Sequence, residues 1–281
     1  MSQPSLSSQV GEIEKHLHVR LFERDRRRVL VTAAGAPVIE RARRLLADAD
    51  DLVLAARQAA DPFTGTWRIG IIPTVSPYLL PAITPALRAR YPRMSFLWVE
   101  ERTDVLRQSL DSGAIDAAIV ALEAEVGAVE SEVIAYDSFV LVTPRESPLG
   151  RKRKPASAAE LRDVNVLLLD DGHCFRDQVL AFCTPANSRE LEFRATSLAT
   201  LVQMVAGGAG VTLLPQLAVA TEAGRSQVLV RPFAKPAPRR TLALCWRRRS
   251  PLAAPLRQVV ATIRTSYPGV PYGAVVGSPV W

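Results

Sequence analysis

The chain has 281 residues, of which 48% are hydrophobic, and a formal net charge of +7. This length predicts a substantial core and more than one domain, and the charge is compatible with a polyanion partner. No apolar run is long enough to span a membrane and no signal peptide opens the chain, so we expect a soluble, cytoplasmic protein without a membrane partner. Three cysteines without a CxxC motif or Cys/His cluster exclude a zinc site and a structural disulfide framework, and we expect no metal or cofactor.

The first segment, from Met1 to about Leu17, predicts a helix with apolar residues at helical spacing. Its other face carries short hydroxyl and amide side chains, which suit contacts with DNA phosphates and base edges. Any solvent-exposed helix could show the same pattern. The candidate DNA contacts in this segment are Ser2, Gln3, Pro4, Ser5, Ser8 and Gln9.

A basic turn with Arg26, Arg27 and Arg28 then precedes a short β-branched strand that ends at Thr32. From Lys15 to Arg44 nine residues are basic and three are acidic. Such an excess is what a phosphate backbone attracts, although a charge run is more often just a solvated surface. We therefore include the three arginines among the candidate DNA contacts.

A long helix is predicted from about residue 33 to residue 60, with Val38, Leu45 and Leu52 seven residues apart. At roughly 42 Å it is longer than a typical globular helix. Its apolar stripe favours pairing with a second helix and hence dimerisation, and the alternative is a helix lying on its own domain. Asp61 to Gly65 breaks the helix and forms a linker.

From Gly65 onwards short apolar strands alternate with helices, which predicts parallel α/β sheets. Helices are expected at 81–91 and 103–112. Two strands end at polar segments, 72–74 and 170–174, and ligand sites in such folds gather at these ends. The expected strands are 67–72, 95–100, 114–121, 139–143, 164–169, 192–195, 210–214, 228–232 and 241–246.

Cys174 follows His173, precedes Arg176 by two residues and stands where a strand runs into a helix. Cationic neighbours and a helix N-terminus both lower the pKa of a thiol, and the thiolate is the form that reacts with peroxide. The alternative is a small buried apolar residue. The polar neighbours His173, Arg176 and Asp177 favour a reactive thiol over a buried apolar residue.

A second thiol, Cys183, follows nine residues after Cys174. In a helix their α-carbons would lie about 13 Å apart, whereas a disulfide needs about 4.4–6.8 Å. A bond between them would therefore require the helix to unwind, which would make it a switch.

Several motifs resemble those of the LysR-type transcriptional regulators over nearly the whole chain. They are Ser2-Gln3-Pro4-Ser5-Leu6-Ser7, Leu21-Phe22-Glu23-Arg24, Thr32-Ala33-Ala34-Gly35, Asp111-Ser112-Gly113-Ala114-Ile115-Asp116 and Gly208 to Pro215. Further motifs resemble the peroxide-sensing members of that family. They are Ile72-Pro73-Thr74-Val75, Asp171-Gly172-His173-Cys174, Arg176-Asp177-Gln178 with Cys183, and Phe193-Arg194-Ala195-Thr196-Ser197-Leu198.

The resemblance implies an α/β protein with a winged helix-turn-helix, a long linker helix that dimerises, and a two-subdomain effector domain like that of periplasmic binding proteins. We assign 1–32 to a partial DNA-binding domain, 33–64 to the linker helix, 65–268 to the effector domain and 269–281 to a tail. It further implies a homodimer or homotetramer that binds promoter DNA, works with RNA polymerase and controls oxidative-stress genes.

The same resemblance implies that Cys174 is the peroxidatic thiol and Cys183 its resolving partner, and that the protein is not an enzyme. Cys245 is assigned to the core. A LysR-type regulator of a small organic ligand in the cleft and a thiol peroxidase remain alternatives, while a solute-binding protein lacks its export signal. The residues implied to hold or polarise hydrogen peroxide are Thr74, Thr103, His173, Arg247 and Asp177.

The family's DNA-binding domain has two elements before the recognition helix, about thirty residues in all, whereas this chain starts at that helix. We expect either a start codon assigned too late or a truncated product. A truncated product should bind DNA weakly or not at all and keep its peroxide chemistry, which a gel shift tests.

Overall fold

The computed structural model describes residues 3–25, 28–58, 61–183 and 189–269. It opens with α1 (Gln3–Leu17), the antiparallel pair β1 (Phe22–Asp25) and β2 (Arg28–Val31), and the long helix α2 (Gly35–Gln58). The Thr32 hydroxyl accepts a hydrogen bond from the Gly35 backbone N–H at 2.8 Å, which caps the start of α2. The predicted first helix and long helix are both confirmed.

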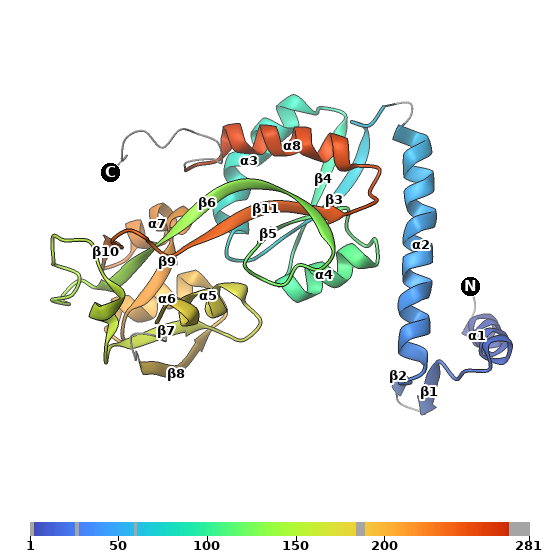
Figure 1. The fold of residues 1–281 in the computed structure, drawn as a ribbon, viewed down its shortest axis with the longest axis horizontal. Helices are drawn as coiled ribbons and strands as arrows, with labels where there is room; N and C mark the ends of the chain where they lie inside the picture. The colour runs from blue at the N-terminus through green and yellow to red at the C-terminus, as the bar shows by residue number, and fades with distance from the viewer. Residues whose placement is uncertain (1–2, 26–27, 59–60, 184–188, 270–281) are drawn as a thin grey trace.

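Helix α2 runs beside the larger part of the molecule and carries α1, β1 and β2 at its far end (Figure 1). Ala47 of α2 is only 3% exposed because it packs against Gly113. Gly113 has φ +73°, and a Cβ there would lie 2.8 Å from the Ala47 Cβ. A glycine at this position therefore allows the close approach of α2 to the α/β part.

The α/β part contains two hydrophobic cores, one drawn from residues 67–135 and 242–267 and the other mainly from residues 139–233. We call the regions around these cores subdomain I and subdomain II. Two long strands, β6 (Val129–Pro144) and β11 (Arg239–Arg247), run antiparallel to each other through their junction (Figure 1). Ile134 of β6 lies in the first core and Leu141 in the second, so this strand is shared.

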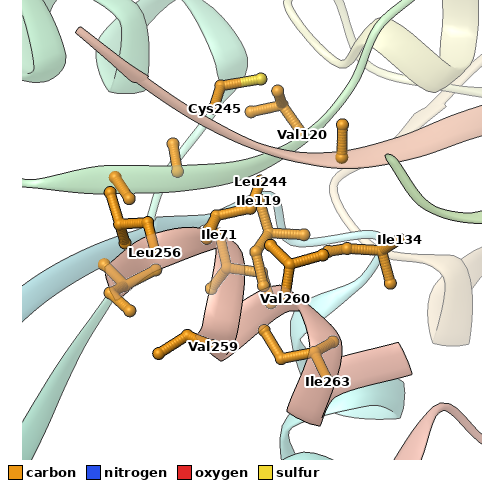
Figure 2. Packing of buried hydrophobic residues seen from close by; sticks show 14 of the residues in the cluster. Ile71, Ile119, Val120, Ile134, Leu244, Cys245, Leu256, Val259, Val260 and Ile263 are labelled. Atoms are coloured by element: carbon orange, nitrogen blue, oxygen red, sulfur yellow. The ribbon is translucent and has the colours of Figure 1, made fainter. Parts of the chain in front are cut away.

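Subdomain I contains three parallel strands covered by helices, and β11 pairs antiparallel with one of them, so the sheet is mixed rather than parallel as predicted. Its strands are β3 (Gly65–Ile71), β4 (Met94–Glu100) and β5 (Ala117–Ala121), and its helices are α3 (Ser76–Arg90), α4 (Thr103–Asp111) and α8 (Ala253–Ser266). Helix α8 turns one apolar stripe, which includes Leu256, Val260 and Ile263, towards Ile71 and Leu244 of the sheet (Figure 2). Cys245 is fully buried in this core, as predicted, and burial raises its pKa to about 12.

Subdomain II holds the segment with the two other cysteines. Its strands are β7 (Asn165–Leu169), β8 (Arg189–Ala195), β9 (Thr212–Pro215) and β10 (Val228–Pro232), and its helices are α5 (Cys174–Cys183), α6 (Leu198–Ala206) and α7 (Gln216–Glu222), with short 3-10 turns at Ala158–Leu161 and Ala223–Arg225. Strands β7 and β8 pair in parallel as a separate two-stranded sheet, whereas β9 and β10 both pair antiparallel with β6 in the larger sheet.

The two largest errors among the predicted boundaries are in β6 and α3. Strand β6 is 16 residues long where 139–143 was expected, because its polar first half is held by pairing with β11 rather than by apolar burial on both faces. Helix α3 begins at Ser76 rather than at residue 81, because Pro77 occupies the first turn and Pro81 lies inside the helix.

None of the helices in the described ranges combines the length and the apolar character needed to cross a membrane.

Candidate functional site

Cys174 is the first residue of α5 and follows a tight loop at the end of β7. Gly172 in this loop has φ +86°, and a Cβ there would lie 2.7 Å from Nη1 of Arg102. The positive φ therefore favours glycine, and any side chain there would displace the Arg102 guanidinium. Neither Cys174 nor Cys183 is in a disulfide; Cys174 is half-buried, and Cys183 is buried at the other end of the same helix.

Three arginines hold the loop before Cys174. Arg176 Nε lies 3.0 Å from an Asp171 carboxylate oxygen, and Arg194 pairs with the same carboxylate. Arg102, which precedes α4 in subdomain I, donates to the Asp171 carbonyl oxygen at 3.1 Å. The loop therefore contacts subdomain II through Arg176 and Arg194, and subdomain I through Arg102. Arg176 was expected to help ionise the thiol, but its charge is paired with Asp171.

A buried arginine from β11 lies at the centre of the junction. Arg240 is 0% exposed and binds the Asp137 carboxylate, with Nε to Oδ2 at 3.0 Å and Nη2 to Oδ2 at 2.9 Å. It also donates to the Thr74 hydroxyl at 2.8 Å and to the Thr74 carbonyl oxygen at 3.1 Å. Its guanidinium carbon lies 5.8 Å from the ring centre of Phe175, the residue after Cys174. Arg240 thus connects three elements around the thiol.

The prediction that Arg247 would join this site is wrong. Arg247 lies at the opposite end of β11, seven residues and about 20 Å from Arg240 at strand rise. Its Nη1 donates to the carbonyl oxygens of Leu110 and Ile115, both at 3.1 Å. Arg240 could have been found from the sequence, since it alternates with Leu242 and Leu244 on one face of the strand.

The Thr103 hydroxyl approaches Cys174 from subdomain I, as the first residue of α4. Its Oγ1 is buried and makes no protein hydrogen bond of normal geometry in the described residues. The structure therefore brings Thr74, Thr103, His173 and Cys174 to one junction. A small hydroxylic ligand beside the thiol would satisfy the Thr103 oxygen.

Burial raises the pKa of the Cys174 thiol, which is the opposite of the expected shift. The Thr103 hydroxyl, the Arg240 charge and the Phe175 backbone N–H all lower this pKa but do not overcome burial. Burial and the nearby Arg102 lower the pKa of His173, although Asp170 opposes this. Near neutral pH, His173 is therefore a neutral neighbour rather than the cation that the sequence suggested.

Asp177 and Gln178 follow on α5, and both line a pocket that also includes Cys174. Asp177 is exposed and raises the thiol pKa by its negative charge. Gln178 lies four residues after Cys174, hence on the same face of the helix. Its amide oxygen and nitrogen are buried without a partner in the described part of the chain. Gln178 belongs to a quoted motif but not to the predicted site residues, although its spacing from Cys174 was a usable signal.

Comparison with known proteins shows the family to which the chain belongs. Residues 60–268 match the family model described as LysR substrate binding domain, and residues 1–36 match that described as bacterial regulatory helix-turn-helix protein, lysR family. The chain belongs to the LysR family. Within it, a probable hydrogen peroxide-inducible genes activator of Streptomyces viridosporus is 43% identical over 275 residues, which cover 96% of this chain and 88% of the relative.

Two OxyR proteins are also similar to this LysR-family chain. The DNA-binding transcriptional dual regulator OxyR of Escherichia coli K12 is 42% identical over 270 residues, which cover 96% of this chain and 88% of the relative. The structure of a Corynebacterium glutamicum OxyR mutant bound to H2O2 superposes with a TM-score of 0.71 at 33% identity, over 95% of this chain and 84% of that one.

The candidate DNA contacts of the LysR-type helix-turn-helix are only partly described. Ser8 and Gln9 are exposed on α1, and Arg28 is exposed at the start of β2. Gln3, Pro4 and Ser5 form the first turn of α1. Ser2, Arg26 and Arg27 lie outside the described residues. The role of all these residues stays a prediction.

We expect the alkylation of Cys174 by iodoacetamide to accelerate about tenfold per pH unit from about pH 7 to about pH 9, since the thiolate reacts and burial holds the thiol pKa above its usual value. Mass spectrometry of the Cys174 peptide measures the rate, and the buried Cys245 peptide of the same sample serves as the internal control. A rate that is already constant near neutral pH would show that the thiolate forms there and would contradict the shift.

Proposed function

We propose that this LysR-family protein is a DNA-binding transcription regulator that senses hydrogen peroxide through Cys174 and Cys183. The observation that carries the proposal is the placement of the two thiols at the two ends of α5, with Cys174 beside Thr103 and near Arg240 at the subdomain junction. The relatives named as hydrogen peroxide-inducible genes activators support the same function.

The chemistry needs only the groups of the junction and the peroxide. The Cys174 thiolate attacks one peroxide oxygen, the O–O bond breaks, and hydroxide leaves and takes up a proton to become water. The sulfenic acid formed on Cys174 then condenses with the Cys183 thiol, with loss of a second water, to give a disulfide. In this proposal Thr103, Gln178 and Arg240 stabilise the negative charge that develops on the leaving oxygen.

The distance between the thiols turns this reaction into a conformational switch. Cys174 and Cys183 are the first and last residues of a ten-residue helix, so their α-carbons lie about 13 Å apart along its axis. A disulfide therefore requires α5 to unwind. Phe175, Val179 and Cys183 are buried in the core of subdomain II, so unwinding of α5 would repack that subdomain.

We further propose a homodimer or homotetramer that binds promoter DNA and acts with RNA polymerase in the cytoplasm. In the single chain, α2 exposes Leu45 by 70%, Leu46 by 67% and Leu52 by 73%. Leucines at this exposure on one helix are what a second helix would cover. Oxidation is proposed to switch the regulator stoichiometrically rather than to turn over peroxide as an enzyme.

The direct test is peptide mapping before and after about one equivalent of hydrogen peroxide, with free thiols trapped by alkylation. We expect a Cys174–Cys183 bond that a dithiol reverses, and its loss in Cys174→Ser and in Cys183→Ser. Cys245→Ser is the matched control and should oxidise normally. If Cys174 could still be alkylated after peroxide treatment, peroxide sensing through this thiol would be contradicted. The same would follow if Cys174→Ser still changed its DNA binding in response to peroxide. A LysR-type regulator that responds to a small organic ligand would then be the better hypothesis.

Ala181→Gly tests the unwinding of α5. Ala181 is exposed on this helix, and glycine costs a helix about 1 kcal/mol relative to alanine. If only the reduced form needs the helix, the disulfide becomes easier to form and its reduction potential falls by about 20 mV. Equilibration with dithiol buffers measures this shift. Ala199→Gly, exposed on α6, should destabilise the protein similarly and leave the potential unchanged, and equal shifts in both variants would argue against unwinding.

A further inference from the structure

Cys174 forms part of the wall of a pocket of about 650 Å³. The pocket lies between α5 and the segments that enter β6 and β11, and its apolar wall comes from Phe139, Ala181, Phe182 and Pro238. Gln178 lines it as well and carries the buried amide without a partner described above. The thiol is therefore reached from a space with an apolar wall on one side and polar and charged side chains, Asp177 and Gln178 among them, on the other.

This space is much larger than hydrogen peroxide requires. A molecule of two oxygens fills roughly 60 Å³, twice the share of one water in the liquid. The pocket volume falls instead in the range of about 300–1,000 Å³ that organic ligands occupy. The pocket can therefore hold an organic group while a hydroperoxide group at its end reaches the thiol.

We propose that this pocket admits organic hydroperoxides, whose apolar group packs against Phe139 and Phe182 while the hydroperoxide group meets Cys174. The proposal rests on the proposed function, since it uses the same reactive thiol. The thiolate takes the terminal oxygen, the O–O bond breaks, and the alkoxide leaves and takes up a proton to become an alcohol. The sulfenic acid then condenses with Cys183 as before.

The charges around the pocket select among such compounds. Among the described residues that line it, Glu123, Glu125 and Asp177 are acidic and Arg239 is the one cation. The Arg239 guanidinium carbon lies 4.4 Å from the centre of the Tyr136 ring. The excess of carboxylates repels anions. Neutral aryl or alkyl hydroperoxides therefore enter, and hydroperoxides that carry a carboxylate are disfavoured.

The test compares two oxidants on the purified full chain, with the rate of Cys174 oxidation measured by quenched alkylation and peptide mapping. Cumene hydroperoxide is the neutral organic probe. Ala181→Trp fills the pocket from an exposed position and should slow oxidation by cumene hydroperoxide about tenfold or more, while oxidation by hydrogen peroxide changes by less than about threefold. Ala199→Trp, exposed on α6 and outside the pocket, is the matched control and should change neither rate.

The outcomes separate this proposal from the proposed function. If hydrogen peroxide oxidised Cys174 and cumene hydroperoxide did not, the pocket would have no role in admitting organic hydroperoxides. The same would follow if Ala181→Trp changed both rates equally or changed neither. In each case the proposal that the protein senses hydrogen peroxide would remain supported. If neither oxidant reacted with Cys174, the proposed peroxide sensing and the proposed role of the pocket would both be contradicted.

The preference for uncharged hydroperoxides is tested by comparing oxidation rates with two hydroperoxides of different charge. Glu125 is exposed at the pocket, and Glu125→Gln should raise the rate with a carboxylate-bearing hydroperoxide by about threefold at low salt and leave the rate with cumene hydroperoxide unchanged. Equal rates in wild type and variant would overturn the charge selection.

Discussion

Replacing Arg240 by alanine is expected to destabilise the reduced protein by about 3–5 kcal/mol and to slow the reactions of Cys174 near neutral pH. Arg240 is 0% exposed and binds Asp137, whose side chain is 1% exposed, so the substitution leaves a buried carboxylate without its cation. It also removes a charge that lowers the pKa of the Cys174 thiol. Denaturant titration measures the stability, and alkylation of the Cys174 peptide measures the reactivity.

Two further variants separate the charge effect from loss of structure. Asp137→Asn combined with Arg240→Ala removes the uncompensated carboxylate and should recover part of the stability, while the reactivity of Cys174 stays low. Arg239→Ala changes the neighbouring arginine, which stacks on Tyr136, and should cost no more than about 1 kcal/mol. Wild-type reactivity of Cys174 in the double variant would show that Arg240 does not act on the thiol.

Phe175→Ala is expected to destabilise the protein about as much as Arg240→Ala does. Unlike Arg240→Ala, it is expected to accelerate the reactions of Cys174. Phe175 is 1% exposed and meets Phe139 edge to face, with ring centres 5.1 Å apart. Removing its ring from the core should cost about 3–5 kcal/mol. Because burial is the main cause of the raised Cys174 pKa, opening the space beside the thiol should lower that pKa and accelerate alkylation.

The control is Phe175→Leu, which keeps most of the apolar volume and should cost less than about 1.5 kcal/mol with little change in thiol reactivity. Denaturant titration and the pH profile of Cys174 alkylation are measured on both variants. Slower alkylation in Phe175→Ala than in the wild type would mean that burial does not control this thiol.

Local patterns in the sequence determined much of the architecture. The seven-residue apolar spacing in α2 predicted one long helix, and the strand before Asp170 followed by a polar turn predicted the start of α5 near Cys174. The separation of Cys174 and Cys183 followed from helix rise alone. These features depend on neighbours in the chain, so they could be predicted without the fold.

The chemistry at Cys174 was decided only by tertiary structure. Its burial and its approach to Thr103 arise where the two subdomains meet, and both are set by residues distant in the chain. Arg240 reaches the junction because β11 pairs with β6 and places it beside Asp137, 103 residues earlier. The sequence alone suggested an acidified thiol, because it shows which charges are near in the chain and not which are paired or desolvated in space. The choice of Arg247 came from the family resemblance, and the pairing of β11 with β6 places Arg240 at the junction instead.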